Sequence, residues 1–269
     1  MHGLLDIQFE RVGEKTIART RAQCAPLKVL KAFYPEGDSP AHLYLLNATG
    51  GVLEGDRMEI NLHLAADAAA VVLMPAATKV HPCPSGDARQ KIRFRLARGS
   101  VLEYLPEPLL PFSGAAFFQE TDIFLEAGAS LFWGDILGPG RLAKGESFAY
   151  RLFENRMKIQ DAAGLIARES FQLAPSLAAV DGLAVMEGAS HMGSLYVIGP
   201  DDKIEALLNA FRGVEESVVY WGASLLSRRG VVVRALSGET PLLQALFSKL
   251  REIFREIVLS RALPPTRRY

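Results

Sequence analysis

The sequence contains little cysteine, and its two cysteines, Cys24 and Cys83, lie far apart and form no CxxC pair. A disulfide framework needs more cysteines than this, and free cysteines fit a reducing compartment. No apolar run reaches the length of a membrane span. Residues 1–11 lack the basic segment and apolar core that open a secretory signal. We therefore expect a cytoplasmic protein without a membrane partner.

An excess of charge of one sign is also missing, because 30 basic and 30 acidic residues cancel. A nucleic-acid-binding domain would show a basic excess on one face, so we expect no nucleic-acid partner. A balanced charge gives little repulsion between molecules and favours association with a protein partner or of the protein with itself. Hydrophobic residues make up 49% of the 269 residues, which supports a sizeable core. We expect one domain over residues 1–269, β-rich in residues 1–200 and helix-containing in residues 201–269.

Catalytic motifs are sparse. Ser85, Ser113 and Ser194 all lack the GxSxG pattern of a nucleophile elbow. The histidines show no pair at metal-binding spacing; they are His2, His42, His63, His81 and His191.

A glycine-rich stretch, Asn47-Ala48-Thr49-Gly50-Gly51-Val52-Leu53-Glu54-Gly55-Asp56-Arg57, superficially resembles a phosphate-binding loop. Such a loop places Lys and then Ser or Thr after its last glycine, whereas here Gly55 is followed by Asp56. A carboxylate would repel phosphate, which argues against a nucleotide site. Glycine allows tight turns, so the stretch predicts a turn presenting Asp56. That carboxylate could be a structural anchor, a helix cap or an oxygen ligand for a cation.

Strand patterns dominate the first two thirds of the chain. Residues 58–64 and 91–96 alternate strictly between apolar and polar side chains, and residues 70–74 are continuously apolar. A weak repeat of strand, tight turn and strand recurs roughly every 30 residues, with Asp67, Gly99 and Gly128 in the turns. This period favours a mainly β fold, a layered β-solenoid, with a β-sandwich as the alternative.

Two helices are predicted in the C-terminal half. Residues 201–214 carry apolar side chains at helical spacing. Residues 240–260 form the clearest helix, with Thr240 as the expected cap and Pro241 in the first turn. Its wide apolar stripe either packs on the β body or docks a partner. The tail, residues 264–269, begins with two prolines and cannot continue this helix.

Several carboxylates are candidates for chemistry. Glu103 and Glu107 flank an apolar stretch, and Asp135 interrupts the apolar strand of residues 131–137. A carboxylate in such a strand must be paired, hydrogen-bonded or hydrated. Arg141 could pair with Asp135 or Glu146. Alternatively, carboxylates inside a β body could pass a divalent cation between weak sites, or could cleave a polysaccharide as paired acids.

Four blocks carry a family resemblance. Gly50-Gly51-Val52-Leu53-Glu54-Gly55-Asp56 and Ala76-Ala77-Thr78-Lys79 are followed by Pro106-Glu107-Pro108 with Phe112-Ser113-Gly114-Ala115. The last block is Trp133-Gly134-Asp135-Ile136-Leu137-Gly138-Pro139-Gly140-Arg141 with Gly145-Glu146-Ser147-Phe148. In order and spacing they resemble the urease accessory protein D family (UreD, also called UreH), from about Leu4 to the tail.

The resemblance implies a helically layered β protein without catalytic activity or a tightly bound cofactor. It implies a scaffold that bridges apo-urease to a helical F-type accessory protein and a G-type GTPase. Such proteins are thought to offer a polar tunnel for nickel in transit. Carried over by position, Asp56, Asp135 and Glu169 match acidic positions tied to that path, and Lys79, Arg141 and Glu146 match structural or polar-path positions.

The chain departs from the family pattern after Lys79, where Val80-His81-Pro82-Cys83 replaces an aromatic and a basic residue. His81 and Cys83 are therefore possible soft ligands for nickel on an exposed turn. We expect a nickel-insertion scaffold. The alternatives are a carbohydrate-active β-solenoid using Glu103, Glu107 or Asp135, and a nucleotide-binding module at the glycine-rich stretch.

Overall fold

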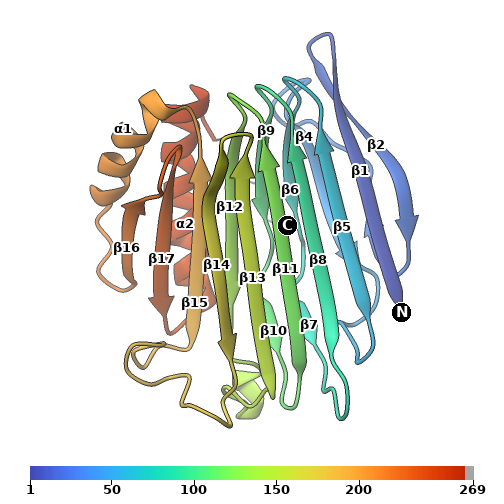
Figure 1. Cartoon of the computed structure of the whole chain (residues 1–269), viewed down its shortest axis with the longest axis vertical. Coiled ribbons are helices and arrows are strands. Elements are labelled where there is room, and N and C mark those ends of the chain that lie inside the picture. Colours follow the sequence, from blue (N-terminus) through green and yellow to red (C-terminus); the bar gives the residue numbers. More distant parts are fainter. Residues whose placement is uncertain (264–269) are drawn as a thin grey trace.

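The computed structural model describes residues 1–263 as two β-sheets packed face to face, with two helices against one of them (Figure 1). The seven-stranded sheet contains, in spatial order, β14 (Gly164–Leu173), β13 (Leu152–Asp161), β11 (Ala116–Leu125), β8 (Ala88–Leu96), β5 (Arg57–Leu64), β1 (His2–Val12) and β2 (Lys15–Cys24). The fold is mainly β, as predicted.

The second sheet is ten-stranded. Its main path contains β16 (Tyr220–Leu225), β17 (Gly230–Ser237), β15 (His191–Ile198), β12 (Ser130–Leu137), β9 (Val101–Leu105), β6 (Ala69–Leu73), β4 (Ala41–Asn47) and β3 (Leu27–Val29). The short strands β7 (Thr78–Val80) and β10 (Leu109–Pro111) pair with each other beside this path, and β10 also pairs with β12. A short 3₁₀ turn, η1 (Leu142–Lys144), follows β12.

The predicted layered repeat is confirmed. Each layer sends one strand to each sheet, as β5–β6, β8–β9 and β11–β12, and strands of successive layers pair in parallel. The predicted turns stack on one another as the layers do. A Cβ atom added to Gly99 would lie 2.2 Å from Asp67 Oδ1, and one added to Gly128 would lie 3.7 Å from the Gly99 nitrogen. A side chain at position 99 would therefore collide with Asp67, whereas position 128 has ordinary van der Waals space and is glycine because of its φ of +73°.

Alternating strands fill the space between the sheets. In β5, Met58, Ile60, Leu62 and Leu64 are at most 2% exposed and belong to the main core cluster, while the residues between them face outward. The continuously apolar β6 is buried on both faces. The alternation in the sequence is therefore the alternation between the core and the outer face of a sheet.

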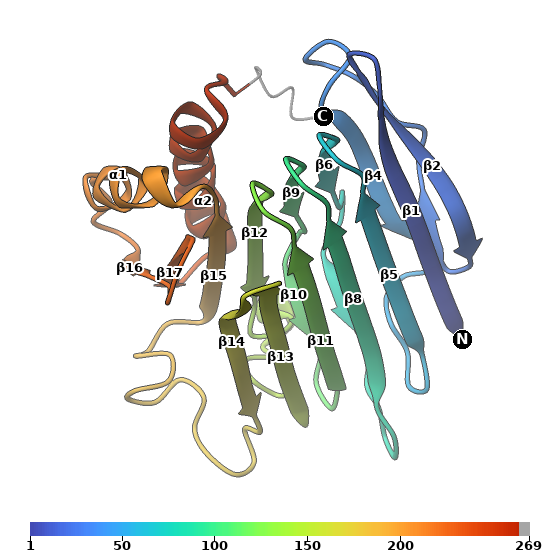
Figure 2. The same ribbon diagram turned by 45° about the horizontal axis from the view of Figure 1, so that its top comes forward.

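The predicted helices cover one end of the outer face of the ten-stranded sheet (Figure 2). α1 (Asp201–Arg212) and α2 (Thr240–Phe254) bury their apolar stripes in a second core cluster together with strand residues such as Phe132. Packing of the α2 stripe on the β body is thus confirmed. Neither helix has the length and hydropathy of a membrane span.

The end positions of α2 differ from the prediction. The N-cap is Glu239, whose φ of −142° and ψ of 137° are extended, so Thr240 is already helical and the expected Thr240 cap is wrong. Pro241 does lie in the first turn. At the other end, α2 continues into a π-helical turn, η2 (Arg255–Leu259). The predicted proline-rich tail lies outside the described residues.

Candidate functional site

A layer of polar side chains crosses the otherwise apolar core. Gln90 in β8, Gln119 in β11 and Asn155 in β13 occupy the same rung of three adjacent parallel strands and point inward. All three are buried, at no more than 9% exposure. The Gln119 side-chain nitrogen lies 3.4 Å from the Asn155 oxygen, and the Gln90 nitrogen lies 3.4 Å from the Gln119 oxygen. Paired amides satisfy one another, which makes their burial tolerable.

Two of the predicted acids are hydrogen-bonded to this layer, one at its middle residue and one at its end. Asp135 Oδ2, from β12 in the opposite sheet, accepts a hydrogen bond from Gln119 Nε2 at 2.8 Å. Glu169 Oε2, from the edge strand β14, accepts one from Asn155 Nδ2 at 3.3 Å. Both acids line a cavity of about 10 Å³, together with Ser194. A cavity of this size has room for roughly one water molecule.

The surroundings disfavour the ionised form of both carboxylates. Desolvation by the core raises the pKa of Asp135 to about 6, although the Gln119 hydrogen bond opposes the change. Desolvation also raises the pKa of Glu169, and the nearby Asp135 charge adds to it while Arg234 acts against it. A cation held between two such carboxylates would offset both their loss of hydration and their mutual repulsion. The arrangement therefore offers oxygen ligands to a small cation.

Asp56 lies elsewhere. Its Oδ1 is 2.5 Å from the amino group of Met1, and its Oδ2 accepts a hydrogen bond from the Leu53 amide at 2.9 Å. Asp56 directly precedes β5, and three strands separate β5 from β14 in the sheet. It does not line the cavity of Asp135 and Glu169. The contacts of Asp56 are those of a buried anchor, and a role for it in metal transit stays a prediction.

The His81–Cys83 turn gives no support to a pair of soft ligands. Cys83 is 1% exposed, and its thiol faces the carbonyl oxygens of His81 and Ala116 at 3.5 Å. The expected exposed turn is therefore wrong for Cys83, because this side chain fills the core. His81 Nε2 lies 3.3 Å from the Gly50 carbonyl oxygen. Among residues 1–263, no three His, Cys, Asp or Glu side chains gather as a metal site.

The expected pairing of Arg141 with Glu146 is confirmed. Arg141 Nε lies 2.8 Å from Glu146 Oε2, and the guanidinium stacks over the Phe112 ring. Glu146 also accepts a hydrogen bond from the Ser113 amide at 3.2 Å, so the pair holds two loops together. Lys79 is exposed in β7. Neither the pair nor Lys79 lines the cavity of Asp135 and Glu169.

Comparison with known proteins identifies the family. The sequence model described as UreD urease accessory protein matches residues 1–269. The chain belongs to the UreD urease accessory protein family. Proteins named urease accessory protein UreD are 28% identical in Lachnoclostridium phytofermentans, over 94% of this chain and 93% of the relative, and 31% identical in Cenarchaeum symbiosum, over 88% and 85%. A third, from Lysinibacillus sphaericus, is 34% identical over 74% of each chain. Membership of the UreD family implies a role in urease maturation.

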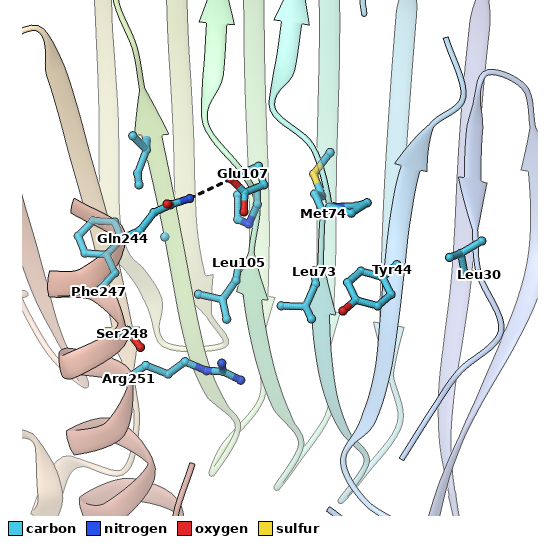
Figure 3. A pocket seen from close by; sticks show the side chains of 14 residues that line it. Leu30, Tyr44, Leu73, Met74, Leu105, Glu107, Gln244, Phe247, Ser248 and Arg251 are labelled. Atoms are coloured by element: carbon cyan, nitrogen blue, oxygen red, sulfur yellow. Dashed lines mark hydrogen bonds between the residues drawn. The ribbon is translucent and has the colours of Figure 1, made fainter. Parts of the chain in front are cut away.

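The carbohydrate-active alternative finds no support in this UreD family fold. Glu103 is 1% exposed and lies between Arg251 and Arg255, with its Oε1 2.7 Å from Arg255 Nη2. Glu107 accepts a hydrogen bond from Gln244 at 2.9 Å, beside a groove of about 660 Å³ between α2 and the outer face of the ten-stranded sheet (Figure 3). Asp135 is partly buried between the two sheets, where it is hydrogen-bonded to Gln119. The three candidate acids therefore do not form a catalytic pair.

Sequence reasoning missed most of the polar layer of this UreD family member. The missed residues are Gln90, Gln119, Asn155, Ser194, Tyr196 and Arg234. A signal existed, because Gln90 and Gln119 occupy positions of β8 and β11 where the alternation requires an apolar residue. A polar residue at an inward position of a strand needs a buried partner.

Proposed function

We propose that this protein is a non-enzymatic scaffold for nickel insertion into apo-urease. It works in the cytoplasm and bridges apo-urease to an F-type accessory protein and a G-type GTPase. Nickel is cargo that passes through the interior between the two sheets, and no cofactor stays bound. The single observation that carries this proposal is a pair of partly buried acids, Asp135 and Glu169, hydrogen-bonded to a continuous layer of amides.

The chemistry of the layer suits transit. Carboxylate and amide oxygens are hard ligands, whereas nickel prefers nitrogen, so binding is weak and release is fast. Asp135 and Glu169 provide the negative charge that a dication needs in the core, because an uncompensated charge there is costly. Gln90, Gln119 and Asn155 extend the oxygen ligands along one rung. A cage of histidine and cysteine would instead trap the ion.

The test replaces the acids without changing their shape. We expect Asp135→Asn and Glu169→Gln to leave the complex with urease and the other accessory proteins intact while lowering the nickel delivered to urease. Complex size is read by size-exclusion chromatography and nickel per urease by elemental analysis. Asp122→Asn is the matched control, because Asp122 lies in β11 at an outward position. Loss of assembly in Asp135→Asn would mean that the carboxylate is structural, and undiminished nickel in both variants would refute the proposed path.

A further inference from the structure

Arg234 continues the rung of Asp135 toward the open end of the space between the sheets. In the ten-stranded sheet, Asp135 in β12 is in register with Ser194 in β15, which is in register with Arg234 in β17. Strand β14, which carries Glu169, is the edge of the opposite sheet, whereas the ten-stranded sheet extends past β15 to β17 and β16. Arg234 therefore lies where the interior opens beyond the edge of β14.

The guanidinium of Arg234 occupies a cation position against Glu169, one of the two partly buried acids. Its Nη2 lies 2.6 Å from Glu169 Oε1 and donates a hydrogen bond to the Tyr196 hydroxyl at 2.5 Å. It also stacks over the Tyr196 ring at 5.1 Å from the centroid. Within residues 1–263, no other basic side chain forms an ion pair with Glu169 or Asp135. The charge that now neutralises this site is thus supplied by one arginine.

Arg234 is more exposed to solvent than the acid that it contacts. Its side chain is 43% exposed, whereas that of Glu169 is 12% exposed. Arginine is long and flexible, and its head is stable in water. A buried structural ion pair such as that of Glu103 with Arg255 has both partners almost fully enclosed, at 2% and 1% exposure. In the pair of Arg234 with Glu169, only the carboxylate is shielded from solvent.

We propose that Arg234 is an exchangeable counter-ion that occupies the place of the metal dication at Glu169 and is displaced into solvent when the dication enters. A guanidinium and a dication cannot both contact the same carboxylate oxygen at short range without strong repulsion. Each entry of metal therefore requires Arg234 to leave, and the return of Arg234 promotes release. Arg234 is a positioning residue that weakens metal binding and prevents trapping. The identity of the cargo rests on the proposed function, but the exchange itself is a property of this chain.

The test measures metal binding by the full chain alone. We expect Arg234→Met, which keeps an apolar stem and removes the charge, to bind Ni²⁺ at least about tenfold more tightly than the wild type, because removing a nearby positive charge favours a dication. Arg234→Lys should stay near the wild-type affinity. Arg156→Met is the matched control, because Arg156 pairs with Glu154 with its side chain 69% exposed. Affinity is measured by competition with a metal indicator.

If the gain in Ni²⁺ affinity depends on Glu169, it comes from this site and not from the change in overall charge. Adding Glu169→Gln to Arg234→Met should abolish the gain in affinity. An affinity for Ni²⁺ that is unchanged in Arg234→Met, or equally raised in Arg156→Met, would overturn the inference. If Arg234→Met folds poorly, Arg234→Gln provides the same comparison with a polar side chain.

Delivery to urease distinguishes this inference from the proposed function. Tighter binding in Arg234→Met should reduce the nickel that reaches urease although the complex assembles. A Glu169-dependent gain in affinity, found together with normal nickel delivery in Glu169→Gln, would support the exchange and refute the transit path. Reduced nickel delivery in Glu169→Gln, found with no gain in affinity in Arg234→Met, would support the transit path and refute the exchange.

Discussion

Asp135 and Gln119 join the two sheets through a single hydrogen bond, with Asp135 Oδ2 2.8 Å from Gln119 Nε2. Asp135 belongs to the ten-stranded sheet and Gln119 to the seven-stranded sheet. A neutral amide could make this contact without the cost of a charge in the core. The carboxylate at this position therefore costs stability, and that cost gives a direct test of whether Asp135 is retained for structure or for transport.

We expect Asp135→Asn to stabilise the protein at neutral pH. Desolvation raises the pKa of Asp135 to about 6 in the folded state from an ordinary value of 3.8. A raised carboxyl pKa means that the folded state holds its proton longer than the unfolded state. The free energy of unfolding therefore falls as pH rises from about 4 to about 6, and by about 3 kcal/mol in total. Above about pH 6 this contribution is constant.

Urea denaturation at a series of pH values measures this effect. The difference in free energy of unfolding between Asp135→Asn and the wild type should be small near pH 4 and largest above pH 6. The control Asp122→Asn, on the outward side of β11, should show no such profile. A wild type that is more stable than Asp135→Asn at pH 7.5 would show that the carboxylate makes a structural contact that the amide cannot replace.

The fold was largely predictable because its signals are local. The alternation in residues 58–64 specifies a strand locally. The turn residues Asp67, Gly99 and Gly128, all at positive φ, specify the turns locally. The polar layer was not predictable in the same way. Gln90, Gln119 and Asn155 meet only because three parallel strands pair in one register, and that register depends on the packing of whole layers.

The partners of the acids depend on contacts that are even more distant in sequence. Glu103 is paired with Arg255, 152 positions later, and Arg234 is paired with Glu169 from another sheet. Asp56 and the amino group of Met1 are brought together by the parallel pairing of β1 with β5. No local pattern encodes such pairings. The family resemblance could therefore point to Asp135 and Glu169 as site residues, whereas Arg234 was identified only from the structure.

We expect Glu103→Gln to be strongly destabilising. Glu103 accepts hydrogen bonds from both Arg251 and Arg255, and Arg255 in turn contacts Glu36 at 2.8 Å. Removing one charge from a buried network leaves the other charges uncompensated, which costs about 3–5 kcal/mol. Because the network ties β9 to α2 and η2, the helical signal should be lost at lower urea in the variant than in the wild type. The measurement is urea denaturation followed by circular dichroism.

An exposed pair provides the control for this prediction. Glu10 pairs with Arg19 at 3.0 Å, and the two side chains are 40% and 62% exposed. Glu10→Gln should change the free energy of unfolding by less than about 1 kcal/mol, since surface ion pairs contribute little. Equal effects in Glu103→Gln and Glu10→Gln would contradict the assignment of Glu103 as the centre of a buried network.

The glycine-rich stretch should respond to substitution as a structural turn. Gly51 has a φ of +150°, and a Cβ added to it would lie 2.6 Å from the Lys79 carbonyl oxygen. That oxygen accepts the Val52 amide at 2.7 Å, so neither backbone segment can move away without breaking the contact between the two loops. Gly55 has a φ of +80° but no atom within 4 Å of an added Cβ. Substitutions at the two glycines therefore distinguish the cost of a steric clash from the cost of backbone strain.

We expect Gly51→Ala to destabilise the protein by about 3 kcal/mol, since it adds an overpacking cost to the backbone strain. Gly55→Ala should cost only the strain of a left-handed conformation, about 1–2 kcal/mol. Urea denaturation of both variants gives the comparison, and nickel delivery by the folded Gly55→Ala protein should remain normal. Selective loss of delivery in a stable Gly55→Ala variant would instead restore a transport role to this turn and to the neighbouring Asp56.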